Sequence, residues 1–141
     1  MFAIARSIAA STIQSAPVSY RFLHSTRCLA MPIKTHLPGY VTKADELKSK
    51  GISEIICLSV NDPFVMEAWG VAQNAKEKIK MLADPKAEFT KAVELEVDIA
   101  PLGGIRSKRY SMVVDNGTVE SINVEPDGTG LSCSLADKIK V

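Results

Sequence analysis

Residues 54–60, Glu-Ile-Ile-Cys-Leu-Ser-Val, constrain the fold of this 141-residue chain more than any other stretch. The run is short, mostly apolar and rich in β-branched residues, which is typical of a strand covered on both faces. Apolar residues at helical spacing from Leu37 to Leu47 precede it, and Gly51 supplies a stop signal for that helix. A helix that leads directly into a doubly covered strand indicates an α/β fold.

The alternation of helix and strand continues toward the C-terminus. Asp62-Pro63 pairs an N-cap residue with a proline at the first helical position, which predicts a second helix. Residues 78–82 then predict a short strand, and Asp84-Pro85 repeats the cap and proline before a helix that reaches about residue 93. The apolar side predicted for the second helix carries Phe64, Ala68, Val71 and Ala72, together with Val65 and Trp69.

From Arg109 onward the pattern changes. Residues 110–114 and 118–124 flank Asn116-Gly117, which predicts a hairpin with a type I′ turn. Leu131, Leu135 and Ile139 recur at intervals of four residues, which predicts a closing helix with Cys133 in its first turn. The whole order of elements indicates an α/β sandwich of the thioredoxin kind.

Composition and charge exclude several classes of protein. With 46% of its residues apolar, the chain can build one core, which excludes a multidomain enzyme. The 17 basic and 16 acidic residues give no case for a nucleic-acid partner, and no apolar run has the length to span a membrane. Leu102-Gly103-Gly104 lacks the setting of a phosphate loop, which argues against a nucleotide-binding domain. Cysteines without a C-x-x-C pair and two histidines, His24 and His36, argue against a metal site.

The first 44 residues contain five basic residues and no acidic one. They are rich in Ser, Thr and Ala, and Arg6, Arg21 and Arg27 are spaced through short apolar clusters, which is typical of a mitochondrial transit peptide. We therefore predict a transit peptide over residues 1–30, a domain over residues 31–141 and a mitochondrial location. Arginine spacing alone also allows a native amphipathic surface helix, and that alternative stays open.

Four stretches of the sequence together resemble one known family. They are Lys-Thr-His-Leu-Pro-Gly-Tyr at 34–40, Cys-Leu-Ser-Val-Asn-Asp at 57–62, Arg-Tyr-Ser-Met-Val-Val at 109–114 and Asn-Val-Glu-Pro-Asp-Gly-Thr-Gly-Leu-Ser-Cys-Ser at 123–134. In this order and spacing, the chain from Lys34 to about Ile139 resembles peroxiredoxin-5, the atypical two-cysteine peroxiredoxins.

The resemblance implies a thioredoxin-fold thiol peroxidase that reduces hydrogen peroxide and alkyl hydroperoxides, is re-reduced by thioredoxin and uses no cofactor. In the family, a cysteine in a Pro-x-x-x-Thr-x-x-Cys loop attacks the peroxide, and a second cysteine resolves the resulting sulfenic acid as a disulfide. Arg109 matches the active-site arginine, and Cys133 matches the resolving cysteine.

Residue type alone is also compatible with purely structural roles for these side chains. Arg109 is also compatible with a solvated base at the start of a strand. Cys133 is compatible with a buried thiol at a helix start, although a helix N-terminus would favour its reactivity. Cys57, inside a doubly covered strand, is expected to serve packing.

The sequence departs from the family where the peroxide would react. In the family an N-terminal hairpin, an apolar central strand and the cysteine loop precede the Lys-Thr-His-Leu stretch, yet residues 31–40 contain no cysteine. Cys28 lies nearby but lacks the Pro and Thr of the loop. We therefore expect an incomplete thioredoxin-like sandwich that is catalytically silent.

The missing central strand would lie between the strands at 54–60 and 110–114. Its absence would leave two edges that pair directly as parallel strands, or that capture a partner and cause self-association. A second function therefore stays open, a non-catalytic interaction module that binds thioredoxin or full-length peroxiredoxin.

Overall fold

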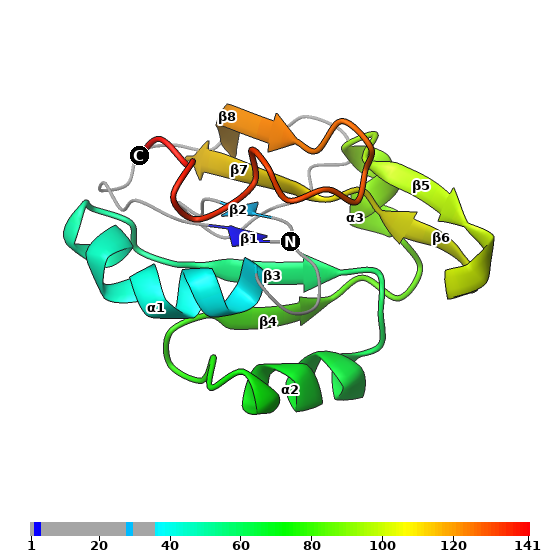
Figure 1. Cartoon of the computed structure of the whole chain (residues 1–141), viewed down its shortest axis with the longest axis horizontal. Coiled ribbons are helices and arrows are strands. Elements are labelled where there is room, and N and C mark those ends of the chain that lie inside the picture. The colour runs from blue at the N-terminus through cyan, green and yellow to red at the C-terminus, as the bar shows by residue number, and fades with distance from the viewer. Residues whose placement is uncertain (1, 4–27, 30–35) are drawn as a thin grey trace, which may run out of the picture.

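The structure, a computed structural model, describes the backbone of residues 2–3 and 28–29 and the whole of residues 36–141 (Figure 1). In chain order the elements are β1 (Phe2–Ala3), β2 (Cys28–Leu29), α1 (His36–Ser49), β3 (Ile56–Ser59), α2 (Pro63–Ala72), β4 (Lys80–Ala83), α3 (Glu88–Ala92), β5 (Glu96–Ile99), the 3-10 turn η1 (Ala100–Leu102), β6 (Gly104–Ser107), β7 (Tyr110–Asp115) and β8 (Thr118–Val124). The predicted α/β class is confirmed.

One mixed sheet forms the centre of the molecule. Its strand order is β4-β3-β2-β7-β8, and β1 pairs with β2. Strands β3 and β4 are parallel from Ile56 opposite Lys80 to Ser59 opposite Ala83, whereas β7 and β8 form an antiparallel hairpin. Strands β5 and β6 form a separate two-stranded sheet.

The central position of the sheet was wrongly expected to be empty. Strand β2 lies there, parallel to β3 through Cys28 opposite Ile56 and antiparallel to β7 through Leu29 opposite Ser111. Strands β3 and β7 therefore run in opposite directions and do not pair with each other, contrary to the parallel pairing expected. Interior strands need backbone partners, and residues set aside from the fold with the first 30 supply them here.

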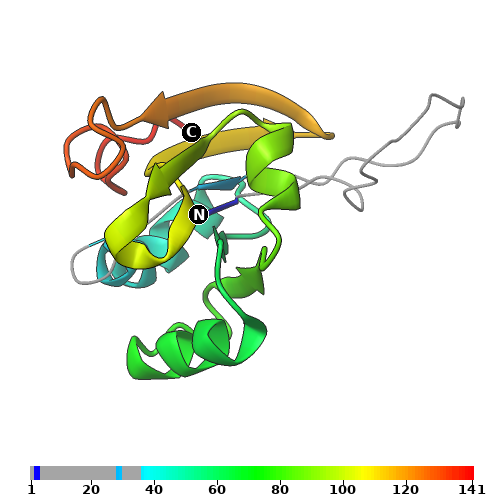
Figure 2. The same cartoon turned by 90° about the vertical axis from the view of Figure 1, so that its right-hand side faces the viewer.

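Strand β3 is covered on both faces, as its sequence predicts. Figure 2 shows α1 and α3 on opposite sides of the sheet. Cys57 belongs to the core cluster shared with α1 and α2, whereas Ile56 and Leu58 belong to a second cluster with Tyr110 and Met112. Alternate residues of β3 therefore serve two separate cores, which explains the continuous apolar run.

Helix α1 buries the side predicted for it, with Leu37, Tyr40, Ala44 and Leu47 inside. Within the described residues, no helix is long and apolar enough to cross a membrane.

Helix α2 begins as predicted but buries only part of the side predicted for it. The Asp62 carboxylate accepts a hydrogen bond from the Val65 N–H at 2.9 Å, which confirms the N-cap. Met66 and Gly70 are the fully buried residues, and Trp69 of the predicted side packs partly buried against the core, whereas Phe64 of that side is 81% exposed. Gly70 allows α2 to approach Met81 of β4, because a Cβ at Gly70 would lie 2.8 Å from the Met81 Cγ. The helix therefore faces the sheet through Met66, Trp69 and the close approach at Gly70.

The helix predicted to follow Pro85 is shorter than expected. It begins only at Glu88, after Ala87 adopts a left-handed conformation with φ of 55°. Asp84 caps this helix across the turn, because its carboxylate accepts hydrogen bonds from the Thr90 N–H at 2.9 Å and the Thr90 hydroxyl at 2.8 Å. The carboxylate thus keeps its capping role while the proline lies outside the helix.

Of the two hairpins, the sequence predicted one and missed the other. In the β7–β8 turn, Asn116 and Gly117 both have positive φ, 48° and 77°, which confirms the predicted type I′ turn. The β5–β6 hairpin was not predicted. Gly103 and Gly104 lie at its turn with φ of 84° and 106°, so this glycine pair has a structural role.

The closing helix predicted from Leu131 to Ile139 is absent. These residues form bends and turns, among which Lys138 donates one backbone hydrogen bond to the Leu135 carbonyl at 2.9 Å. The reason lies in the polar groups that hold residues 132–134.

Candidate redox site

Arg109 lies between β6 and β7 and anchors a loop that follows β8. Its guanidinium donates a hydrogen bond to the Gly130 carbonyl at 2.6 Å, and its backbone N–H donates to the Gly128 carbonyl at 2.8 Å. Burial lowers the pKa of Arg109, while the carboxylates of Glu125 and Asp127 act in the opposite direction. Arg109 remains a permanent cation that fixes the loop from one side.

Residues 125–134, here called the Cys133 loop, are organised by the buried carboxylate of Glu125. The carboxylate accepts backbone hydrogen bonds from Ser132, Cys133 and Ser134 at 2.8, 3.0 and 2.9 Å, and from the Ser132 and Ser134 hydroxyls at 2.6 Å each. Burial by itself raises the pKa of Glu125, but the hydrogen bonds from Ser132 and Ser134 outweigh it and lower the pKa to about 2. Glu125 is therefore an anion at any physiological pH.

The predicted closing helix fails to form because Glu125 captures its first N–H groups. A helix beginning near Leu131 would need these N–H groups at its N-terminus and the following carbonyls as acceptors. Instead the Ser134 carbonyl accepts hydrogen bonds from His36 Nε2 at 2.5 Å and from the Tyr40 hydroxyl at 2.8 Å. Tertiary polar contacts thus replace local helical ones, and Cys133 does not occupy a helix N-terminus.

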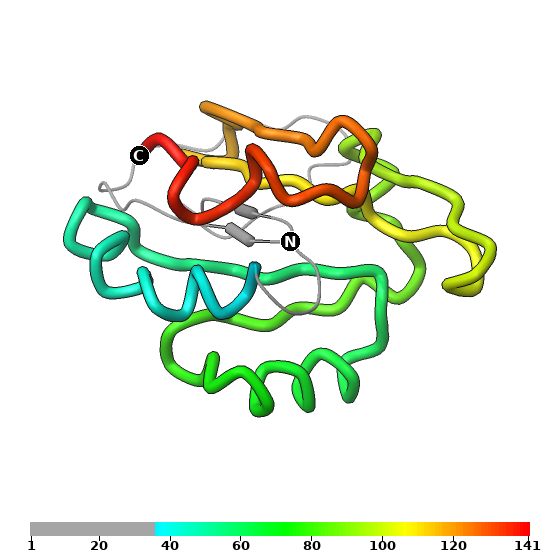
Figure 3. The backbone as a smooth tube through the Cα atoms, viewed as in Figure 1, coloured from blue at the N-terminus to red at the C-terminus, as the bar shows by residue number. Residues whose placement is uncertain are grey.

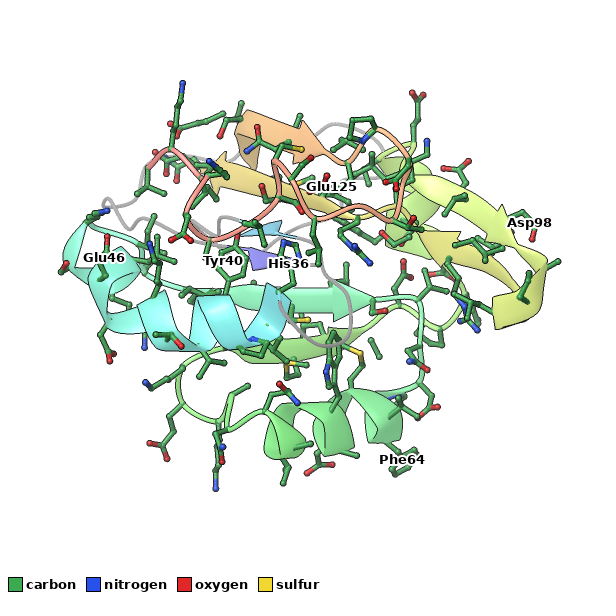
Figure 4. All side chains as sticks on the ribbon, viewed as in Figure 1. His36, Tyr40, Glu46, Phe64, Asp98 and Glu125 are labelled. Carbon is green, nitrogen blue, oxygen red and sulfur yellow. The ribbon has the colours of Figure 1, made fainter. Side chains whose placement is uncertain are left out.

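His36 and Tyr40 connect the start of α1 to the Cys133 loop. Figure 3 shows the C-terminal segment turning back toward the first turns of α1, and Figure 4 places His36 and Tyr40 beneath it. Burial lowers the pKa of His36 to about 4, although the hydrogen bond to Ser134 opposes this shift. The ring is therefore neutral near pH 7, and Nε2 carries the proton that it donates.

Cys133 is half-buried in this loop. Its Sγ donates a hydrogen bond to the Val124 carbonyl at 3.4 Å, while its N–H points to the Glu125 carboxylate. Arg109 therefore contacts the loop that contains Cys133, and Glu125 links the two because its own N–H donates to the Arg109 carbonyl at 2.9 Å.

The remaining thiols occupy the sheet. Cys57 in β3 is wholly buried, and burial raises the pKa of its thiol, consistent with a packing role. Cys28 lies in β2. Among the described residues, no three His, Cys, Asp or Glu side chains gather as they would around a metal ion.

Glu125 and His36 were not identified as site residues from the sequence. Both lie in stretches that carry the family resemblance, but neither has a local pattern that indicates its partners. The one available signal is an acidic residue at a strand end, followed seven residues later by Ser-Cys-Ser, whose hydroxyls and N–H groups suit a carboxylate.

A comparison with protein families matches the Redoxin model to residues 20–139. The chain belongs to the Redoxin family. Among curated proteins, this redoxin is 48% identical over 107 residues to Peroxiredoxin-2D of Arabidopsis thaliana, covering 75% of this chain and 66% of that protein. It therefore spans just under two thirds of the length of the first curated relatives it matches.

Solved structures place this redoxin among the peroxiredoxins. Reduced Prx3 from Vibrio vulnificus, in complex with H2O2, is 50% identical with a TM-score of 0.72, covering 78% of this chain and 71% of that one. Peroxiredoxin 5 from Alvinella pompejana is 45% identical with a TM-score of 0.61, covering 67% of this chain and 62% of that one. The thioredoxin-like α/β fold is thereby confirmed, and thiol peroxidase chemistry is the general activity of the family.

Proposed function

We propose that this chain is a peroxiredoxin-5-type member of the thioredoxin-dependent thiol peroxidases, in which Arg109 is the active-site arginine and Cys133 the resolving cysteine. The observation that carries the proposal is that Arg109 contacts the loop that contains Cys133, through its hydrogen bond to Gly130, while Glu125 holds the Cys133 N–H within that loop. A resolving thiol must lie in a segment that can be presented to a partner, and Cys133 is half-buried near the surface.

The chain by itself is proposed to be catalytically silent. Residues 31–40 hold no cysteine, and Cys57 is wholly buried inside the sheet with a raised pKa. Peroxide reduction needs a thiolate, aligned donors and a dry pocket acting together, and their contributions are not additive. Arg109 alone would supply only the cationic donor.

The test is a thioredoxin-coupled peroxide assay on the full chain. Consumption of hydrogen peroxide should not exceed that of a Cys133→Ser variant. A turnover that disappears with Cys133→Ser but not with Cys57→Ser would overturn the silent assignment and make Cys133 the peroxidatic residue. Thioredoxin dependence is tested separately, by asking whether a thioredoxin lacking its second active-site cysteine is trapped as a mixed disulfide at oxidised Cys133.

A mitochondrial location with a transit peptide over residues 1–30 is part of the same proposal. It is supported by the five basic residues and no acidic one within the first 44. N-terminal sequencing of the organellar protein should find a start between about residues 23 and 31. An intact N-terminus on a cytosolic protein would contradict it. The non-catalytic interaction module is not favoured, because nothing in the loop geometry is specific to it.

A further inference from the structure

Glu125 is a buried carboxylate that the proposed peroxidase chemistry leaves without a role. Glu125 is only 2% exposed. The five hydrogen bonds that its carboxylate accepts all come from residues 132–134. An ionised group in such a place needs strong donors to replace water. The same three residues that hold the thiol therefore solvate this charge.

The backbone N–H groups of residues 132–134 form an anion-binding site, and the carboxylate of Glu125 is the anion bound there. Three consecutive N–H groups, from Ser132 to Ser134, converge on one carboxylate oxygen at 2.8–3.0 Å. Successive N–H groups on one side of the backbone form a concave site for an anion. Once that backbone is fixed, the Cα–Cβ bond of Cys133 is fixed with it, and only rotation about χ1 can still move the sulfur.

In this arrangement the sulfur of Cys133 is engaged in a hydrogen bond. Sγ of Cys133 donates to the Val124 carbonyl at 3.4 Å, at the end of β8. Formation of a disulfide proceeds through the thiolate, which has lost the proton that this hydrogen bond uses and is repelled by the carbonyl oxygen, so the sulfur must leave that carbonyl. Movement of the side chain alone is limited because the backbone on both sides is bound to Glu125.

We infer that Glu125 is a latch, a positioning residue that holds Cys133 in an unreactive arrangement and must release residues 132–134 before the thiol can form a disulfide. The inference rests on the proposed function only for Cys133 as the reacting thiol. In that reaction the Cys133 sulfur bonds to the sulfur of a cysteine sulfenic acid on another peroxiredoxin chain. The S–O bond breaks, the thiol proton leaves with the hydroxyl as water, and the thiol is oxidised as the sulfenic sulfur is reduced.

The contacts of Ser134 make a local release feasible. Its carbonyl is bound by His36 and Tyr40 on α1, at 2.5 and 2.8 Å, and not by Glu125. The loop can therefore leave the carboxylate while this second attachment stays in place. Opening at Glu125 should expose Cys133 without unfolding the sheet that contains Cys57.

The experiment compares alkylation rates at two thiols of the full chain. Native protein is treated with iodoacetamide, and labelling at Cys133 and Cys57 is followed by mass spectrometry of the separate peptides. Glu125→Gln keeps the shape of the side chain and removes its charge, so labelling at Cys133 should rise about tenfold, the factor that loss of one charge-assisted hydrogen bond allows. The Cys57 rate should not change. Glu96→Gln on exposed β5 is the matched control and should alter neither rate.

A rise of equal size at both thiols would overturn the latch, because it would mean global loosening. An unchanged rate at Cys133 would do the same. Should Glu125→Gln fail to fold, Ser134→Ala carries the test, since it removes one hydroxyl donor and leaves the carboxylate. It should raise labelling at Cys133 alone, by a smaller factor, and no rise would refute the inference. Neither peroxide nor thioredoxin enters the measurement, so failure of the proposed peroxidase role would not imitate failure of the latch.

Discussion

The Cys133 loop and helix α2 are held to the same domain in opposite ways. The loop has no regular secondary structure, yet a buried carboxylate, an arginine and two side chains of α1 fix it by directed hydrogen bonds. Helix α2 is regular and capped, yet it fully buries only Met66 and Gly70 and leaves Phe64 exposed. Figure 4 shows Phe64 at the far side of the molecule from Glu125.

This contrast separates regularity from positional order. Directed bonds to a charge are short in range and demand one geometry, whereas apolar contact tolerates small shifts. The proposed release of Cys133 requires bonds of the first kind, which hold the thiol in one place until they break. The two regions should therefore respond differently to substitution.

The largest effect is expected for Glu125→Ala. Removing the carboxylate leaves three N–H groups and two hydroxyls without their acceptor, and buried unsatisfied donors destabilise by about 1–3 kcal/mol each before relaxation. We expect the free energy of unfolding to fall by at least about 3 kcal/mol. Urea titration followed by circular dichroism measures it, with Glu96→Ala as a surface control expected within about 0.5 kcal/mol. An unchanged midpoint would show that the loop contributes nothing to stability.

Acid should act on the Cys133 loop in two successive windows. The pKa of His36 falls from 6.5 to about 4 on folding, so the unfolded chain binds the extra proton and stability decreases as pH drops from 6.5 toward 4. The pKa of Glu125 falls from 4.5 to about 2, so a further decrease follows as pH drops from 4.5 toward 2. Urea midpoints across this range should slope in both windows, and His36→Gln should flatten only the upper one. Equal slopes in the two proteins would contradict this assignment.

A smaller effect is expected where α2 meets β4. Gly70→Leu would force Met81 aside, because even a Cβ lies 2.8 Å from its Cγ, and such overpacking typically lowers stability by about 1–3 kcal/mol. Adding Met81→Ala should restore part of the loss by making room. Phe64→Ser on the exposed side of the same helix is the control and should leave the unfolding midpoint within error. A double variant no better than Gly70→Leu would rule out this contact as the cause.

The smallest effect concerns the cap of α2. Asp62→Ala removes the acceptor of the Val65 N–H bond and should lower stability by about 1 kcal/mol. Asp62→Asn retains an acceptor oxygen and should lose much less. Since the cap lies far from Glu125, alkylation of Cys133 should be the same in all three proteins. A change there would mean that the two regions are coupled.

The sequence predicted those elements whose signals are local. Asp62-Pro63 and Asn116-Gly117 determined a helix start and a turn because each acts within four residues. The hairpin of β5 and β6 was missed, although Glu96-Val97-Asp98-Ile99 alternates polar and apolar residues as a half-buried strand does. The buried part of α2 could not be read from hydrophobicity alone, because Phe64 is exposed while Gly70 packs against Met81.

The candidate site was predicted only in part. Arg109 and Cys133 came from the family resemblance, whereas Glu125 lies in one of the resembling stretches, 123–134, without a role being predicted for it. The closing helix was wrong for the same reason, since its spacing of apolar residues was sound but its N–H groups were taken by Glu125. No periodicity reveals which donors a distant carboxylate will bind. The outcome depends on the contacts of residues 132–134 with Glu125 after β8 and with His36 and Tyr40 of α1.

Strand β2 lies within the segment that the proposed cleavage would remove. Its two residues, Cys28 and Leu29, join the β4–β3 half of the sheet to the β7–β8 half, and both fall inside the proposed transit peptide. Cleavage after residue 30 would therefore divide one sheet into two. Residues 28–29 would then serve both the proposed targeting sequence and the central strand β2, so import and folding would compete for them. The order of events, import before folding or the reverse, would then decide which molecule the cell obtains from this sequence.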